Sequence, residues 1–271
     1  MASETDKFLQ VARNLALDAA KVVLGFLHGP IDKRQKSDNT PVTAADLASD
    51  RLIREGLRRE FPEHGVLTEE TGYQAGSNSE FTWVVDPLDG TKAFAKGIPG
   101  FSVMIGLLHD GIPVLGVVAD PLEDRLYEAV RGQGAYHLFQ GHREAVRVSD
   151  RREFSEMPVV ISTGFPDEKL ALARQSLGFP LVPPINSVGI KVGLLVRQIG
   201  DIYLNHHGVS YWDTCAPQVI LEEAGGLMTL MDGGKLSYDL NSGREHPTPT
   251  LASNGTRHQD ILEWCRRLGI P

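Results

Sequence analysis

The chain of 271 residues has only two cysteines, Cys215 and Cys265. Their spacing matches no metal-ligand motif, and two cysteines do not make the disulfide framework that stabilises many small secreted domains. A reducing compartment fits this usage best. We therefore expect a cytoplasmic protein.

Long apolar runs are also missing. No stretch approaches the roughly 18 apolar residues that a membrane-spanning helix needs. The first residues, MASETDK, carry acidic side chains where a signal peptide would be basic. The sequence therefore predicts neither membrane insertion nor export.

Basic residues are outnumbered, with 27 Lys and Arg against 35 Asp and Glu and a net charge of −8. This balance argues against a nucleic-acid polymer or an acidic membrane surface as partner. It does not exclude a small phosphorylated substrate, because a bound metal ion inverts the local field. The hydrophobic fraction of 41% is that of an ordinary globular protein.

Hydrophobic periodicity divides the chain into two halves. The first half combines amphipathic helices with strands that pair as hairpins, and the second alternates helices and strands. The polar, aperiodic stretch 140–158 between them indicates a boundary. We therefore expect an N-terminal α+β lobe, residues 1–148, and a C-terminal α/β lobe, residues 149–271.

The segment 83–91, WVVDPLDGT, is the strongest local signal. An apolar run reads as the end of a buried strand and opens into a loop that contains Asp86 and Asp89, followed by Gly90 and Thr91. Two carboxylates there suit a hard divalent cation such as Mg2+, which prefers oxygen ligands. The backbone N–H groups at a helix start beginning with Gly90 and Thr91 are anion donors. The segment thus predicts a cation site beside an anion site.

Further carboxylates fall at the ends of other expected elements. Glu69 and Glu70 follow a short apolar pair, Asp46 lies in the first turn of a helix that starts at Thr43, and Asp213 opens a later helix. Metal-assisted phosphoryl transfer needs several carboxylates that converge from different elements. The alternative is that each carboxylate caps a helix or is simply solvated, and for Glu70 and Asp213 taken alone it is the favoured one.

A covalent mechanism is a second alternative. In haloacid-dehalogenase phosphatases a strand ends in Asp-x-Asp-Gly-Thr, and the first Asp is the nucleophile. Here two residues, Pro87 and Leu88, separate the aspartates, and Pro87 constrains the loop. A nucleophilic Asp86 is therefore a minor alternative.

Four motifs together resemble the Mg2+-dependent, lithium-sensitive inositol monophosphatase superfamily. That superfamily carries an Asp, a Glu-Glu pair, Asp-Pro-Ile/Leu-Asp-Gly/Ser-Thr and Trp-Asp-x-x-Ala-Ala/Gly in this order. In this chain they stand as Asp46, Glu69-Glu70, Asp86–Thr91 and Trp212–Pro217. The resemblance implies a layered αβαβα sandwich of the inositol monophosphatase and fructose-1,6-bisphosphatase type. Pro217 replaces the usual Ala or Gly, and we expect little effect because proline fits a first helical turn.

The resemblance also implies roles for individual residues. The metal ligands, for two or three Mg2+ ions, would be Glu69, Asp86, Asp89, Asp213 and the carbonyl of Leu88. The N-terminal lobe would thus carry most metal ligands, and the C-terminal lobe would carry Asp213 and substrate contacts. Gly90 and Thr91 would bind the phosphate. Asp46 and Thr91, with Glu70 also in the catalytic group, would orient and deprotonate the attacking water, and no covalent intermediate would form.

The substrate is harder to assign. The segment 205–208, NHHG, lacks the acidic residue with which inositol monophosphatases hold sugar hydroxyls. Lys92, Ser187 and Lys191 resemble the 3'(2'),5'-bisphosphate nucleotidase branch, although either lysine could also lie on a solvated helix face. His206 is expected in a loop or in the substrate pocket.

We therefore expect hydrolysis of adenosine 3',5'-bisphosphate to AMP and phosphate. An inositol-1-monophosphatase or other sugar phosphatase is the alternative, and a non-catalytic relative that binds metal or phosphate is a minor one. The expected partner is a small phosphorylated substrate, with a homodimer left open.

Overall fold

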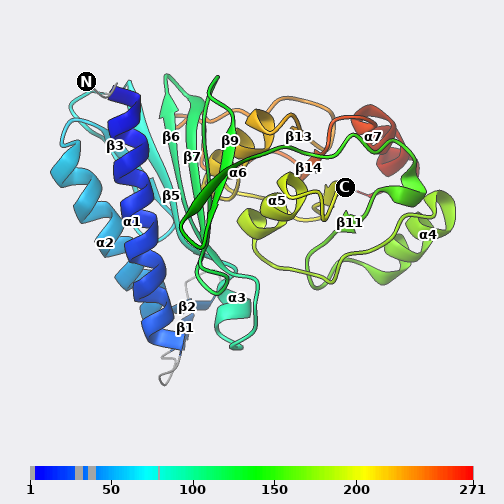
Figure 1. Ribbon diagram of the computed structural model, residues 1–271, viewed down its shortest axis with the longest axis horizontal. Helices are drawn as coiled ribbons and strands as arrows, with labels where there is room; N and C mark the ends of the chain where they lie inside the picture. The colour runs from blue at the N-terminus through cyan, green and yellow to red at the C-terminus, as the bar shows by residue number, and fades with distance from the viewer. Residues whose placement is uncertain (1–3, 28–32, 36–40, 79, 271) are drawn as a thin grey trace.

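The computed structural model describes residues 4–27, 33–35, 41–78 and 80–270. Within these residues the elements form five layers that alternate between helices and sheets (Figure 1). The expectation of an αβαβα sandwich is thereby confirmed. No helix in these ranges is long and apolar enough to span a membrane.

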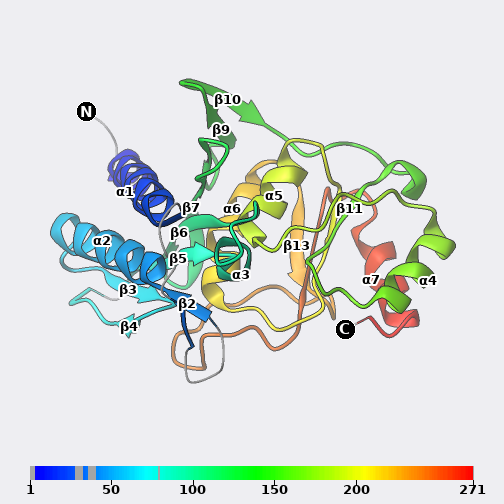
Figure 2. The ribbon, with the colours of Figure 1, turned by 90° about the horizontal axis from the view of Figure 1, so that it is seen from below.

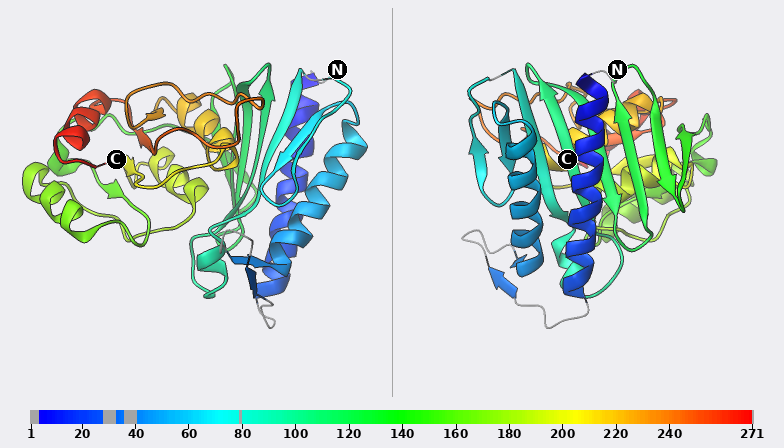
Figure 3. Two further views of the ribbon diagram at one scale, coloured as in Figure 1. Left: turned by 180° about the vertical axis from the view of Figure 1, so that it is seen from behind. Right: turned by 60° about the vertical axis from the view of Figure 1, so that its left-hand side comes forward.

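The outer helical layer consists of α1 (Glu4–Leu27) and α2 (Ala44–Glu60). Both lie against one face of the large sheet (Figure 3, right). Helix α2 starts where the sequence predicts, because Thr43 and Asp46 form a capping box. A short antiparallel pair, β1 (Lys33–Gln35) and β2 (Pro41–Thr43), precedes it.

The large sheet has the order β10-β9-β8-β7-β6-β5-β3-β4, and only its β3–β5 pair is parallel. Strands of the first half pair as hairpins, as expected: one turns at Asp110-Gly111, and another joins β8 to β9. The strands of this sheet are β3 (Gly65–Thr68), β4 (Gly72–Gln74), β5 (Phe81–Asp89), β6 (Ser102–His109), β7 (Ile112–Asp120), β8 (Arg125–Val130), β9 (Ala135–Phe139) and β10 (His142–Val146).

Strand β10 lies inside the polar stretch that predicted a lobe boundary. Its residues are almost all exposed at the edge of the sheet, where it projects from the body of the molecule (Figure 2). An edge strand with two solvated faces has no apolar alternation, so its sequence resembles a linker. The lobe limits of 1–148 and 149–271 stay a prediction.

The second sheet has the order β11-β12-β14-β13. Helices α5 and α6 lie between the two sheets, and α4 and α7 cover the far side (Figure 1). The strands are β11 (Val159–Val160), β12 (Ile202–Leu204), β13 (Leu227–Leu230) and β14 (Thr250–Ser253), and the remaining helices are α3 (Thr91–Phe94), η1 (Phe154–Glu156), α4 (Asp167–Leu177), α5 (Val188–Val196), α6 (Tyr211–Glu223) and α7 (His258–Arg267).

Helix α6 packs very closely on the large sheet at two glycines. Gly106 and Gly116 are register partners on β6 and β7. A Cβ on Gly106 would lie 2.5 Å from Cys215 Sγ, and a Cβ on Gly116 would lie 2.3 Å from the carbonyl oxygen of Ala216. No other residue type fits there, so these two glycines fix how near α6 approaches the strands.

The placement of Pro217 differs from the prediction. The sequence put this proline in a first helical turn, but α6 begins at Tyr211, so Pro217 lies in the helix interior. A proline there has no N–H for the carbonyl four residues earlier, which belongs to Asp213. The helix nevertheless continues to Glu223.

Candidate active site

The sequence predicted that Asp86 and Asp89 lie in a loop after a strand. Instead, both belong to strand β5 and lie on either side of a β-bulge. Asp86 pairs with Met104 and Asp89 with Ser102, so three steps along β5 match two along β6. Side chains three apart on a regular strand point to opposite faces. The extra residue removes this alternation, and both carboxylates line one cavity.

Hydrogen bonds hold the bulge in place. The Pro87 carbonyl accepts a 2.7 Å hydrogen bond from the buried Ser49 hydroxyl on α2. The Leu88 N–H donates to Asp86 Oδ1 at 3.0 Å, and the Leu88 carbonyl accepts from Thr91 Oγ1 at 3.0 Å. A carbonyl oxygen has two lone pairs. Leu88 therefore keeps acceptor capacity for a cation.

Gly90 turns the chain from β5 into α3. Its φ of 86° lies in the left-handed region, and a Cβ there would lie 2.4 Å from the Gly100 carbonyl oxygen. Both facts require glycine. The predicted helix start is confirmed, with Gly90 at the N-cap and Thr91 as first helical residue.

Asp213 reaches the same cavity from the start of α6. Its Oδ2 accepts a 2.6 Å hydrogen bond from the Ser210 N–H in a capping box. Capping, which the sequence left as an alternative, is therefore real. It does not exclude a role in the cavity, because carboxylate oxygens of Asp86, Asp89 and Asp213 lie within 4.8 Å of one another.

The cavity between these carboxylates has a volume of about 390 Å³. Its walls come from β5, α3, the start of α6 and two connections. It contains Glu69, Leu88, Gly90 and Thr91 in addition to the three aspartates, together with Ser210, Trp212 and Glu245. Every residue predicted as a metal ligand therefore lines one space.

The carboxylates of this cavity are unstable as a group of free anions. Burial and the charges of Glu69, Asp89 and Asp213 raise the pKa of Asp86 well above its usual range. Burial, with Asp89 next, raises the pKa of Asp213 to about 8. Like charges that cannot all ionise unaided are stabilised by a divalent cation. The donor set of carboxylate and carbonyl oxygens also suits Mg2+.

Asp89 is fixed by the start of α5. Its Oδ2 accepts hydrogen bonds from Ser187 Oγ at 2.6 Å and from the Gly189 N–H at 3.1 Å. Ser187 is the N-cap of α5 and is fully buried. The sequence suggested that Ser187 contacts the substrate. In the structure it lies behind Asp89 and lines neither this cavity nor the second one described below.

Asp46 and Thr91 meet beside the cavity, as predicted. Thr91 Oγ1 lies 3.1 Å from Asp46 Oδ1, while Asp46 Oδ2 accepts from the Thr43 N–H and hydroxyl at 2.7 and 2.6 Å. Burial raises the pKa of Asp46, and the hydrogen bonds from Thr43 and Thr91 oppose this rise. The pair has the geometry for transferring the hydroxyl proton of Thr91 to Asp46.

A second cavity of about 350 Å³ adjoins the first and shares Glu69, Gly90 and Thr91 with it. Lys92 and His206 line it, as predicted for substrate contacts. His207, in the segment 205–208 that the sequence singled out, also lines it. The sequence did not identify three further lining residues, because they follow no periodic pattern: Ser162, Thr163 and Asn186.

Lys191 lies behind this second cavity. It is fully buried, so a solvated helix face is the wrong interpretation for it. Its Nζ donates to Ser162 Oγ at 2.6 Å and to the Asn186 carbonyl at 3.2 Å, and it lies 4.4 Å from the ring centre of Tyr203. Burial lowers its pKa to about 8 against the opposing charges of Asp89 and Asp213.

The two glutamates after β3 differ in position. Both are half-buried in the turn that follows the strand. Glu69 lines both cavities, whereas Glu70 lines neither. A catalytic role for Glu70 stays a prediction.

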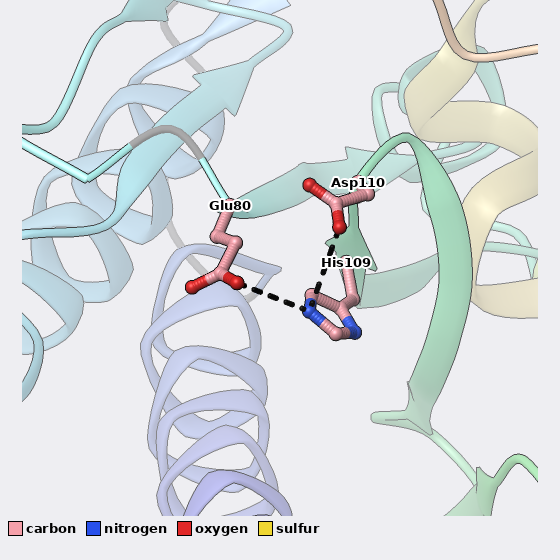
Figure 4. A group of neighbouring side chains, drawn as sticks. All are labelled: Glu80, His109 and Asp110. Atoms are coloured by element: carbon pink, nitrogen blue, oxygen red, sulfur yellow. Dashed lines mark ion pairs between the residues drawn. The ribbon is translucent and has the colours of Figure 1, made fainter.

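A further group of potential ligands lies at the surface. Glu80, His109 and Asp110 point toward one another at the turn that joins β6 to β7 (Figure 4), with His109 Nε2 3.9 Å from Glu80 and 3.8 Å from Asp110. All three are exposed. Their charges are screened by water and form weak ion pairs, in contrast to the buried aspartates.

The sequence matches the model of the inositol monophosphatase family over residues 4–263. It is 35% identical over 237 residues to the 3'(2'),5'-bisphosphate nucleotidase CysQ of Escherichia coli, covering 86% of this chain and 93% of that one. It is 34% identical over 263 residues to the histidinol-phosphatase of Mycobacterium tuberculosis, covering 94% and 96%.

Solved structures agree. The inositol monophosphatase of Anabaena (Nostoc) superposes with a TM-score of 0.78 at 31% identity, covering 99% of this chain and 98% of that one. The motifs, the layered fold and these similarities have one explanation. The chain belongs to the inositol monophosphatase family, and it is a metal-dependent phosphomonoesterase.

Proposed function

We propose that the protein is a Mg2+-dependent 3'(2'),5'-bisphosphate nucleotidase that converts adenosine 3',5'-bisphosphate to AMP and phosphate. The observation that carries this proposal is a pair of adjoining cavities of which only the second has lysines beside it. One is lined by carboxylates, and the other by Lys92 with the buried Lys191 behind it. A substrate with two phosphates needs a cationic environment for the second phosphate in addition to the metal site.

The charge of the second cavity comes mainly from the lysines. Burial, with His207 next and Lys191 after it, lowers the pKa of His206, so its ring is neutral near pH 7 and offers a hydrogen bond. The 35% identity to CysQ supports the same substrate.

The acidic cavity would hold two or three Mg2+ ions. Their ligands would be the carboxylates of Glu69, Asp86, Asp89 and Asp213 and the carbonyl of Leu88. Bound Mg2+ supplies charge neutralisation at the phosphate and makes water more acidic. Backbone N–H groups at Gly90 and Thr91 would donate to the phosphate oxygens, since the first N–H groups of a helix have no intrahelical partner.

The proton transfer would use Thr91 and Asp46. A water molecule hydrogen-bonded to Thr91 Oγ1 gives it a proton, while the Thr91 hydroxyl passes its own proton to Asp46 Oδ1 across 3.1 Å. The water oxygen forms the new bond to phosphorus, the bond from phosphorus to the ribose 3'-oxygen breaks, and the leaving oxygen takes up a proton from solvent water, so that AMP and phosphate are released. No protein side chain is phosphorylated in this reaction.

A substrate panel tests the proposal. Phosphate release is measured from adenosine 3',5'-bisphosphate, inositol 1-phosphate, histidinol phosphate and fructose 1,6-bisphosphate, with and without Mg2+ and Li+, and with Asp89→Asn as control. We expect kcat/KM for the bisphosphate nucleotide to exceed the others by about ten-fold or more, which is about 1.4 kcal/mol of transition-state discrimination. Equal or higher values for another ester would contradict the substrate assignment.

A second substrate class remains a candidate because of one comparison. The histidinol-phosphatase relative is 34% identical over 94% of this chain. The rates for histidinol phosphate and adenosine 3',5'-bisphosphate in the panel therefore distinguish a monophosphate with an amino group from a bisphosphate. Activity that persists without Mg2+ and in Asp89→Asn would contradict the metal mechanism itself.

A further inference from the structure

The connection from β13 to β14 carries a glutamate to the metal cavity. Glu245 bridges to Ser210, and the flanking residues form backbone hydrogen bonds to the chain that enters α6. The Tyr211 N–H donates to the Arg244 carbonyl at 2.8 Å, and the His246 N–H donates to the Val209 carbonyl at 2.9 Å. The segment 244–246 is thus fixed against the turn that positions Asp213.

The charge of Glu245 has no cation beside it. The neighbouring guanidinium of Arg244 donates to the carbonyls of Leu240 and Gly243 and lies 5.1 Å from the ring centre of Tyr73. No ion pair to Glu245 is found within the described residues. Glu245 therefore brings a further carboxylate to the cavity that Asp86, Asp89 and Asp213 already line.

Glu245 differs from these aspartates in its access to water. It is exposed, whereas Asp86 and Asp89 are 2% and 7% exposed. Mg2+ loses its water shell reluctantly and is commonly held through several waters and few carboxylates. An exposed carboxylate at the mouth of the cavity suits an ion that keeps most of its water.

We propose that Glu245 is a further ligand, direct or through water, for the divalent ion bound nearest the solvent, and that it sets the affinity of this ion. The inference rests on the metal site in the proposed function. The inference concerns the ion that binds most weakly, because the buried aspartates dominate the binding of the other ions.

Binding of Mn2+ to the metal-free protein provides the test. Free Mn2+ is measured by electron paramagnetic resonance and binding heat by calorimetry in the wild type and Glu245→Gln. A matched control is Glu168→Gln, an exposed glutamate on α4. We expect Glu245→Gln to weaken the weakest step by about five-fold or more, from the loss of one charge near a doubly charged ion. Glu168→Gln should leave every step unchanged.

Trp212 gives a second readout, since it lines the same cavity as Glu245. Its fluorescence change on titration with Mn2+, identified by its loss in Trp212→Phe, should shift to higher concentration in Glu245→Gln. Glu245→Asp keeps the charge and should recover most of the affinity. Thermal unfolding of each variant without metal shows that it is folded.

The outcomes separate the inference from the function on which it rests. If the wild type binds Mn2+ and Glu245→Gln binds it equally well at every step, Glu245 is not a ligand and only the inference is overturned. If the wild type binds no divalent ion, both the inference and the proposed metal site are overturned.

Discussion

Thr91 Oγ1 and Asp46 Oδ1 lie 3.1 Å apart although their residues are 45 positions apart in the chain. The contact joins the end of the bulged strand to the first turn of α2. Asp46 is also fixed by Thr43, and the single hydroxyl proton of Thr91 is shared between Asp46 Oδ1 and the Leu88 carbonyl. Such a preorganised pair is what proton transfer requires.

Removing either member of this pair should lower kcat strongly. We expect Asp46→Asn and Thr91→Ala each to reduce kcat by about 10²- to 10⁴-fold, the usual contribution of a positioned acid or base. The double variant should lose little more than the worse single variant, because the two residues act as one unit. Steady-state phosphate release measures this. Losses that multiply in the double variant would contradict a shared step.

Stability without metal should fall as the pH rises. Burial, with Asp89 next, raises the pKa of Asp213 from 3.8 to about 8, so between these values the folded protein binds more protons than the unfolded chain. This contribution is present at low pH and is lost as the pH rises through about 8.

The measurement is thermal unfolding in chelator at pH 5.5 and 8.5. Asp213→Asn should show a smaller drop in Tm between the two pH values than the wild type, by about 2 °C or more. Mg2+ should raise the Tm of the wild type more at pH 8.5 than at pH 5.5. Parallel pH profiles for the two proteins would rule out this role for Asp213.

Lys191 should affect a bisphosphate more than a monophosphate. Lys191→Met keeps the apolar stem but removes the ammonium that contacts Ser162 and Asn186. We expect KM for adenosine 3',5'-bisphosphate to rise by about ten-fold, from the loss of one positive charge behind the second cavity, with a smaller change for inositol 1-phosphate. The exposed Lys92→Met is the comparison. Equal changes for both esters would show a purely structural lysine.

Ser49 should influence the active site through the bulge. Ser49→Ala removes the 2.7 Å hydrogen bond to the Pro87 carbonyl and leaves a buried acceptor unsatisfied, which costs about 1–3 kcal/mol of unfolding free energy. Because the bulge aims both aspartates, kcat should fall as well. Ser176→Ala is the control, since Ser176 forms an exposed hydrogen bond to the Leu172 carbonyl on α4. It should change neither quantity appreciably.

Local signals in the sequence predicted much of this fold. The capping box at Thr43 and Asp46 marks the start of α2, and Asp110-Gly111 marks the β6–β7 hairpin, because both patterns act within a few residues. The motif residues at 86–91 pointed to the segment that lines the acidic cavity. These features depend on neighbours in the chain.

Features that depend on distant partners were missed. The bulge arises from pairing with Ser102 and Met104 on β6, and strand β10 exists only because it continues an existing sheet edge. Ser187 looked like a substrate contact until α5 placed it behind Asp89. Glu245 and Asn186 reach the two cavities from irregular connections, where no period or motif marks a residue.

The two glycines under α6 have a consequence for metal binding. Asp213 is followed directly by the turn of α6 that rests on Gly106 and Gly116, while Asp86 and Asp89 belong to the same sheet. The distance between Asp213 and the aspartates of β5 therefore depends on how closely α6 approaches the sheet. A single methyl group at either glycine would act as a spacer. It would change the distance between Asp213 and the aspartates of β5 without altering any of the three carboxylates.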